Sequence, residues 1–305
     1  MPDARPVIAV VGPTATGKSD LAIALAQRFD GEIVNADSMQ LYRGMDIGTA
    51  KLAEDERGGI EHHVLDIWPV TRTASVAEYQ FISRIAIDAI HARGRVPVLV
   101  GGSGLYVRAA LDKLEFPAES PEVRSRLMAE LADVGPEALH ARLAEVDPIA
   151  ATAILPTNDR RIVRALEVFE ITGRPFSATM PTFDSLYDTT FLGLDRADLD
   201  ERIAARVHRM VGAGLLDEVR GLLPLGIRAT TAGKALGYQQ LLDVLDDDGT
   251  VTGDVDGAVA ETIRATTRFV RRQRSWFRRD PRVRWLDAAA PDLVDAAAAL
   301  VPLKP

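Results

Sequence analysis

The chain contains no cysteine among its 305 residues. This absence excludes disulfide bonds, thiolate zinc sites and cysteine nucleophiles. The five histidines include one adjacent pair, His62–His63. Neighbouring side chains on an extended segment point in opposite directions, so we favour core or loop roles for this pair over a metal site.

Long apolar runs are also missing. No stretch of about 18 uninterrupted apolar residues could cross a bilayer, and residues 1–6 lack the basic and apolar pattern of a signal peptide. We therefore expect a cytoplasmic protein with no membrane partner. The composition, with 47% apolar and 26% charged residues, is typical of a globular protein. The length of 305 residues is sufficient for a nucleotide-binding core and a smaller appendage.

The net charge of −8 argues against a polyanionic partner, but the basic residues are concentrated. Residues 264–284 contain nine arginines against the single Asp280, a local charge of +8 on an otherwise acidic chain. This basic tract is a candidate surface for nucleic acid. The acidic stretch 243–256 reads as a solvated, turn-rich loop.

Alternating strand and helix patterns predict a parallel sheet covered by helices. Short β-branched or apolar runs at 7–11, 32–36, 96–101 and 187–195 are the expected strands. Amphipathic patterns between 113 and 195 predict a helical insertion, which leaves 1–112 and 196–305 as the core. After the last strand, Asp198 is expected to cap a helix, and an alanine-rich helix is expected at 288–300.

Residues 12–19 match G-x-x-x-x-G-K-S/T between a strand and a helix, the context that this phosphate-binding motif requires. Its backbone N–H groups can surround a phosphate, Lys18 can neutralise oxygens, and the Ser19 hydroxyl can ligate Mg²⁺. The expected fold is therefore α/β, with a P-loop NTPase-like parallel sheet flanked by helices and an all-helical insertion domain. The residues of this phosphate loop are Gly12, Pro13, Thr14, Ala15, Thr16, Gly17, Lys18 and Ser19.

A phosphate loop alone is also typical of ATP-binding and other nucleotide-binding enzymes such as kinases. Those enzymes place an acidic residue at the end of a second strand to hold magnesium. Here the strand at 96–101 continues into Gly102 and Ser103 without an acid. Asp37 follows another strand, at the edge where parallel sheets bind ligands, and is the best candidate for a base or a magnesium-linked carboxylate.

Six segments in unbroken order resemble the tRNA dimethylallyltransferases, also called tRNA isopentenyltransferases. The likeness extends from about residue 7 to Trp285, and the block from DSMQ to GTAK is specific to that family. The segments are GPTATGKS (12–19), NADSMQLYRGMDIGTAK (35–51), HHVLDI (62–67), VLVGGSGLY (98–106), NDRRIVRALE (158–167) and GKALGYQQ (233–240).

The resemblance implies transfer of a five-carbon group from dimethylallyl diphosphate to N6 of adenosine 37, beside the anticodon of tRNA. The phosphate loop would then hold the leaving diphosphate with Mg²⁺. Lys18 and Arg206 would stabilise the charge that develops on it. By the same likeness Asp37 is the general base, and Thr14 and Ser19 are the active-site hydroxyls.

The resemblance also implies a set of tRNA contacts, with the insertion clamping the anticodon stem-loop. Ser103 stands where the family usually has Thr, which preserves the hydroxyl, and Arg160 stands where many members have Gln. The strip from Lys234 to Gln239 varies in the family. The implied contacts are Asp37, Ser38, Met39, Gln40, Ser103, Arg124, Arg160, Arg161, Arg164, Lys234, Gly237, Tyr238 and Gln239.

Three other functions remain open at this point. A P-loop small-molecule kinase would need the missing strand-end acid, and a prenyltransferase acting on AMP or ADP would not need the insertion or the basic tract. A noncatalytic RNA-binding module would not need Gly17, Lys18, Ser19 and Asp37 together. No self-association signature stands out, so a monomer is expected.

Overall fold

The computed structural model describes residues 5–117, 119–179 and 183–303. The chain divides into a core, up to Leu111 and from Ser185 onward, and an insertion unit, Asp112–Asp184. The predicted insertion continued to 195 and so included the strand at 187–195. That strand pairs with the first strand of the sheet and belongs to the core, which corrects the end of the insertion to Asp184.

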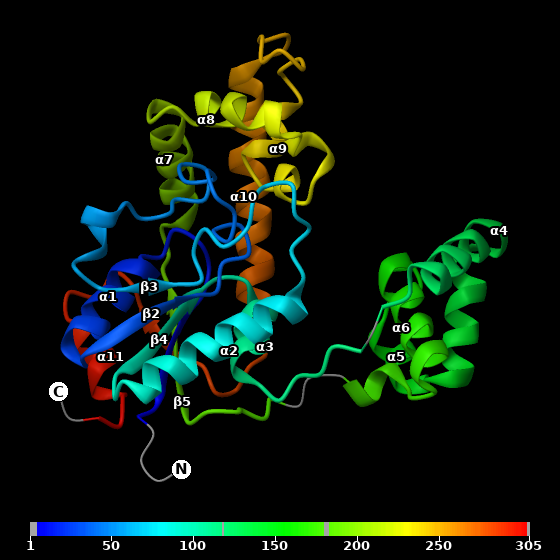
Figure 1. Ribbon diagram of the computed structural model, residues 1–305, viewed down its shortest axis with the longest axis horizontal. Coiled ribbons are helices and arrows are strands. Elements are labelled where there is room, and N and C mark those ends of the chain that lie inside the picture. The colour runs from blue at the N-terminus through cyan, green and yellow to red at the C-terminus, as the bar shows by residue number, and fades with distance from the viewer. Residues whose placement is uncertain (1–4, 118, 180–182, 304–305) are drawn as a thin grey trace. The chain divides into compact units, whose positions relative to one another are not determined.

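The core contains a six-stranded sheet in which all paired strands are parallel, in the order β3-β2-β4-β1-β5-β6 (Figure 1). The four predicted strands are confirmed. The third and the last strands along the chain were not predicted, because they have only two and four residues; the last is also mostly exposed and begins at the end of the basic tract. The strands are β1 (Val7–Val11), β2 (Gly31–Asn35), β3 (His62–His63), β4 (Val96–Gly101), β5 (Thr189–Asp195) and β6 (Arg284–Asp287).

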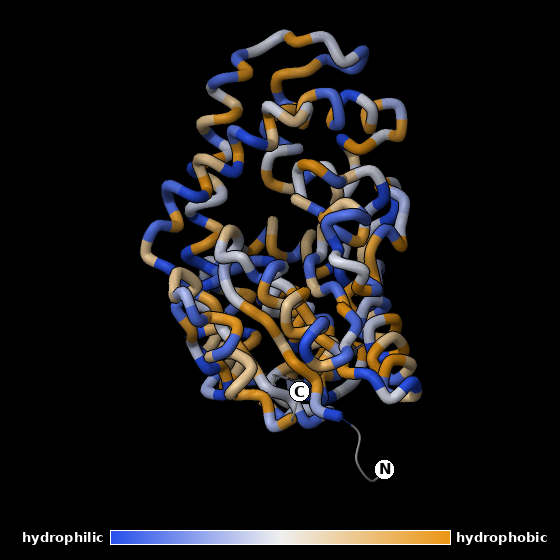
Figure 2. Tube along the Cα trace, turned by 90° about the vertical axis from the view of Figure 1, so that its left-hand side faces the viewer, coloured by the Kyte–Doolittle hydropathy of each residue, from blue (hydrophilic) through white to orange (hydrophobic). Residues whose placement is uncertain are grey.

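Helices cover both faces of this sheet, and all of β1 is buried. On one face, α1 (Lys18–Arg28) and α11 (Leu293–Ala299) pack in a cluster with apolar side chains of the four central strands. Helices α2 (Val76–Ala92) and α3 (Gly104–Leu111) also contact the sheet. Figure 2 shows a continuous apolar stretch in the lower part of the view, whereas apolar and hydrophilic positions alternate along the helices.

A second group of helices lies at one end of the core, at the top of Figure 1. These helices are α7 (Leu199–Gly212), α8 (Leu215–Leu222), α9 (Tyr238–Leu242) and α10 (Val255–Phe277). Asp198 occupies the N-cap position of α7, but its carboxylate binds Arg196 and makes no cap hydrogen bond, so that prediction is wrong in detail. The acidic stretch lies in the connection between α9 and α10, as predicted, whereas the alanine-rich helix begins only at Leu293.

The insertion unit consists of α4 (Pro121–Val146), α5 (Pro148–Ala153) and α6 (Asp159–Thr172), which enclose their own apolar cluster. A break at Gly135, where φ is 82°, divides α4 into the two predicted amphipathic segments. Ser120 and Asn158 cap α4 and α6. Short 3-10 helices occur at Glu54–Arg57, Phe176–Thr179, Leu223–Leu225, Ile227–Ala229 and Ala232–Lys234. Within the described ranges no helix has both the length and the apolarity needed to cross a membrane.

Candidate active site

The phosphate loop joins β1 to α1 and is held by contacts within itself. At Gly12, φ is 133° and an added Cβ would lie 2.3 Å from the Leu194 carbonyl oxygen, so only glycine fits. The Thr16 hydroxyl donates to the Pro13 carbonyl at 2.9 Å, and Lys18 Nζ donates to the same oxygen at 2.5 Å. The sequence motif therefore forms the turn that it predicts, with the lysine folded over it.

The charged groups around this loop influence one another. Burial and the neighbouring Arg206 lower the pKa of Lys18 to about 7, while Asp37 opposes the shift. Burial also lowers the pKa of Arg206, which Asp37 raises and Arg209 lowers further. An anion bound beside Lys18 and Arg206 would favour the charged form of both, so the site is suited to a phosphate group.

Asp37 follows β2 and is held by Asn35. The Asn35 side-chain oxygen accepts from the Asp37 backbone N–H at 2.9 Å, and its amide nitrogen donates to the carbonyl of Val64 at 3.0 Å. The Asp37 carboxylate accepts from the Met39 backbone N–H at 2.9 Å. Asn35 was not predicted as a site residue, although a polar side chain at the end of a buried strand was the available signal.

The strand order brings the predicted residues together, because β4 lies between β1 and β2. Ser103, after β4, has its hydroxyl 3.5 Å from that of Ser38. A cavity of about 340 Å³ opens at these strand ends, which we call the acceptor cavity. Its polar lining includes the predicted residues Thr14, Asp37, Ser38, Ser103, Arg206 and Lys234, and its apolar lining includes Met39, Ile203, Val207 and Met210.

Arg206 of α7 lines the acceptor cavity and a second cavity of about 200 Å³ beside the phosphate loop, the loop cavity. Lys18, Ser19 and Asp20 line the loop cavity with Arg202 and Arg209 of α7. Arg202 Nε donates to the Ala15 carbonyl at 2.9 Å. Arg202 and Arg209 were not among the predicted site residues; their spacing from Arg206 on one helix was the signal that could have placed them at the loop.

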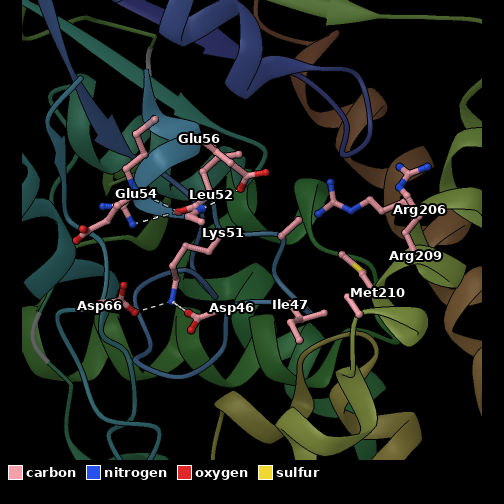
Figure 3. Close-up of a pocket in the computed structure, with 14 residues that line it drawn as sticks. Asp46, Ile47, Lys51, Leu52, Glu54, Glu56, Asp66, Arg206, Arg209 and Met210 are labelled. Carbon is pink, nitrogen blue, oxygen red and sulfur yellow. Dashed lines mark hydrogen bonds and ion pairs between the residues drawn. The ribbon is translucent and has the colours of Figure 1, made fainter. Parts of the chain in front are cut away.

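Arg206 and Arg209 also border a larger cavity of about 700 Å³ (Figure 3). Figure 3 shows them on one side and Lys51 on the other, where Lys51 Nζ binds Asp46 at 2.6 Å and Asp66 at 2.5 Å. The Arg206 guanidinium donates to the Thr49 carbonyl at 3.4 Å. The segment 46–49 therefore supports the arginine, and its residues Gly48 and Thr49 line the acceptor cavity together with Arg206.

Glu218 of α8 holds this segment. Its carboxylate accepts from the backbone N–H groups of Asp46, Ile47 and Gly48 at 3.0, 2.7 and 3.1 Å. The Tyr238 hydroxyl donates to the same carboxylate, and the Tyr238 side chain is fully buried. The Tyr238 side chain therefore has a structural role, and the tRNA contact predicted at this position stays a prediction.

The remaining predicted contacts of the core differ in their exposure. Gln40 donates from its amide to the Thr49 carbonyl at 3.1 Å and so also supports the 46–49 segment. Lys234 and Gln239 are exposed, and Gly237 lines the acceptor cavity. Their roles in tRNA binding remain predictions.

In the insertion unit, the buried Glu167 binds Arg124 at 2.8 Å and Arg164 at 2.7 Å. These two arginines therefore carry a structural ion pair in addition to the predicted RNA contact. Arg160 and Arg161 are exposed at the first turn of α6.

Two places in the described core offer oxygen or nitrogen ligands for a metal ion. Ser19 and Asp20 lie in the first turn of α1 and line the loop cavity, where their oxygens suit Mg²⁺ beside a phosphate. The second is the cluster Glu32, Glu61 and His63. Burial would raise the pKa of Glu32, but hydrogen bonds from Arg93 and His63 lower it to about 2. Glu32 is therefore already paired with the guanidinium groups of Arg93 and Arg95 and hydrogen-bonded to His63, which favours the structural role predicted for the histidine pair.

Comparison with known proteins gives one family. The profile of the family described as IPP transferase matches residues 40–280. The chain is 66% identical over 297 residues to a tRNA dimethylallyltransferase of Streptomyces avermitilis, covering 96% of this chain and 94% of that protein. It is 64% identical over 303 residues to one of Thermobifida fusca, with 97% and 94% covered.

Solved structures agree with this result. A tRNA isopentenylpyrophosphate transferase of Bacillus halodurans is similar with a TM-score of 0.70 and 39% identity, over 97% of both chains. A eukaryotic dimethylallyltransferase acting on tRNA gives a TM-score of 0.80 at 27% identity, covering 97% of this chain and 77% of that one. The chain therefore belongs to the IPP transferase family, together with the tRNA dimethylallyltransferases of Streptomyces avermitilis and Thermobifida fusca.

Proposed function

We propose that this protein transfers the dimethylallyl group of dimethylallyl diphosphate to N6 of adenosine 37 in tRNA. The products are N6-(dimethylallyl)adenosine and diphosphate. One observation carries the proposal: Arg206 lines both the loop cavity and the acceptor cavity, and it interacts electrostatically with Lys18 and Asp37. A cationic phosphate site and a candidate base therefore meet where an alkyl group could pass between two ligands.

The donor would bind with its diphosphate in the phosphate loop. Backbone N–H groups at the start of α1, Lys18 and Arg206 would hold the phosphate oxygens. As the bond between C1 of the prenyl group and the diphosphate oxygen breaks, negative charge grows on the leaving group. Arg206 and Lys18 stabilise that charge without moving far, which lowers the barrier to transfer.

The acceptor adenine would leave its stack in the anticodon loop and enter the acceptor cavity. Its N6 nitrogen would attack C1 of the prenyl group from the side opposite the diphosphate. N6 gains the carbon and loses one proton, which the Asp37 carboxylate accepts. Ser38 and Ser103 would hydrogen-bond the base edge, and Val207 and Met210 would contact the apolar prenyl chain; all four residues line the acceptor cavity.

Magnesium fits this scheme at Ser19, whose hydroxyl would ligate the ion beside the phosphate oxygens. When bound, Mg²⁺ would neutralise charge on the departing diphosphate. Lys18 and Arg206 contribute to the same task from the protein side.

The tRNA itself would be bound by the insertion unit and by the basic tract. On α10, Arg264 and Arg268 are paired with Glu261 at 2.8 and 2.6 Å. By contrast, within the described residues no ion pair is formed by the exposed Arg271 and Arg272. We assign the backbone phosphate contacts of α10 to Arg271 and Arg272, because an unpaired arginine does not have to give up a carboxylate to bind RNA.

A direct test follows label from radioactive dimethylallyl diphosphate into tRNA, AMP or neither, in the presence of magnesium. ATP with the same acceptors is the control for kinase activity. Label on adenine in tRNA alone supports the proposal, whereas label on AMP alone or phosphate transfer from ATP contradicts it.

The phosphate contacts have their own test, with a matched control on the same helix. Arg271→Ala/Arg272→Ala should reduce the slope of log K against log salt for tRNA binding by roughly 0.7–0.9 for each phosphate that is no longer bound. Arg264→Ala/Arg268→Ala removes the same charge and should change the slope less. Equal effects of the two pairs would contradict the assignment.

A further inference from the structure

One amide side chain connects three segments that surround the acceptor cavity. Gln273 lies on α10, and its side chain is buried, with 6% of the residue exposed. Its Oε1 accepts from the backbone N–H of Thr14 at 3.0 Å, and its Nε2 donates to the carbonyl of Gly102 at 2.9 Å. A single residue of α10 therefore bonds both the phosphate loop and the loop that follows β4.

The fit around this amide is close. A Cβ on Gly102 would lie 2.4 Å from Gln273 Nε2 and 3.1 Å from the carbonyl oxygen of Gly12. The two backbone loops and the amide therefore pack with no room for an extra methyl group. Both ends of the amide are used, one as acceptor and one as donor, which fixes the orientation of the side chain.

The two loops that Gln273 joins carry different halves of the proposed reaction. Thr14 belongs to the loop that would hold the donor diphosphate. Ser103 follows Gly102 directly and lines the acceptor cavity with Asp37. The distance between the donor and the acceptor base therefore depends on how these loops are held together, and Gln273 bonds each of them through its backbone.

We propose that Gln273 is a positioning residue for alkyl transfer. It sets the distance between the phosphate loop, which would hold the donor, and the loop that follows β4, which lines the acceptor cavity through Ser103. This inference rests on the proposed function, because the separation matters only if two ligands react across it. Gln273 itself touches neither reacting atom. Its loss should slow the chemical step while leaving each substrate bound.

Two variants of similar side-chain length test the role. Gln273→Met removes both hydrogen bonds with little change in volume, and Gln273→Glu retains the acceptor but loses the donor to Gly102. Each should reduce kcat in single-turnover transfer by roughly ten- to a hundredfold, the scale of a small misplacement of reacting groups. The Kd values for dimethylallyl diphosphate and tRNA should stay within about twofold of wild type.

Phe277→Leu is the matched control, because Phe277 is buried on the same helix one turn further on. It should lower Tm and leave kcat near the wild-type value at temperatures below melting. All proteins are compared at one temperature below the lowest Tm. Wild-type kcat in both Gln273 variants, or a loss in kcat that Phe277→Leu reproduces at equal Tm, would overturn the inference. Absence of transfer by the wild-type protein would instead refute the proposed function.

Discussion

Raising the pH is expected to weaken the binding of dimethylallyl diphosphate through Lys18. Burial and Arg206 lower the pKa of the free ammonium to about 7, whereas a bound diphosphate would favour its charged form and raise that pKa. The charged form is fully present well below pH 7 and is lost as the pH rises. If the bound pKa returns to about 10, Kd should increase roughly fiftyfold between pH 7 and pH 9.

Calorimetry in buffers of different ionisation heat measures the protons taken up on binding. Wild type should take up about half a proton at pH 7 and about 0.9 at pH 8 through Lys18. Lys18→Arg keeps a permanent charge and provides the control, because the ligand's own ionisation is the same for both proteins. Equal proton uptake and equal pH slopes in the two proteins would refute the reasoning.

Three further changes have defined outcomes. Lys18→Met should raise Tm at pH 7, because it removes a desolvated cation next to Arg206, and should abolish transfer; an unchanged or lower Tm in thermal unfolding would contradict this. Arg206→Lys should reduce single-turnover kcat roughly ten- to a hundredfold with tRNA affinity retained, since an ammonium cannot reproduce the guanidinium's planar fork; equal kcat would remove its role. Glu32 is 1% exposed, and its pKa in the fold is about 2. Its ionised form should therefore contribute roughly 3 kcal/mol to the free energy of unfolding above about pH 4.5, and this contribution should be lost as the pH falls toward 2. Glu32→Gln should remove this pH-dependent part of the free energy of unfolding, measured in urea. A pH profile identical to that of the wild type would contradict the stabilisation assigned to the bonds of Glu32 with Arg93 and His63.

Local sequence patterns predicted the helices and strands whose formation depends mainly on residues close together in the chain. The run at 7–11 and the motif at 12–19 predicted β1, its loop and α1, because burial of a parallel strand and the glycine positions leave a clear pattern. Strands β3 and β6 were missed because edge strands of two and four residues with no fully buried position need no apolar run. The position of Asp198 at a helix start was predicted, but its choice of Arg196 over the helix N–H groups depends on tertiary geometry.

The site was predictable only where one segment carries the chemistry. The phosphate loop and Asp37 stand next to predicted strands, and the strand order then brings them together through β4. Gln273 lies in a helix whose most evident sequence feature is its arginines, and its bond to Thr14 joins residues far apart in the chain. The sequence likewise does not predict that the carboxylate of Glu218 accepts from three backbone N–H groups of a distant segment. Such interactions follow from packing between distant segments, which hydrophobic periodicity does not encode.

The most direct test of the account compares wild type with Asp37→Asn in single-turnover reactions on tRNA that carries adenosine at position 37. Mass spectrometry of the digested tRNA locates the added five-carbon group, and filter binding measures tRNA affinity in parallel. The account predicts modification of N6 at that adenosine by wild type, a loss of roughly a hundred- to ten-thousandfold in rate for Asp37→Asn, and similar tRNA binding by both. Modification by Asp37→Asn at the wild-type rate, or modification of a different nucleotide by wild type, would contradict it.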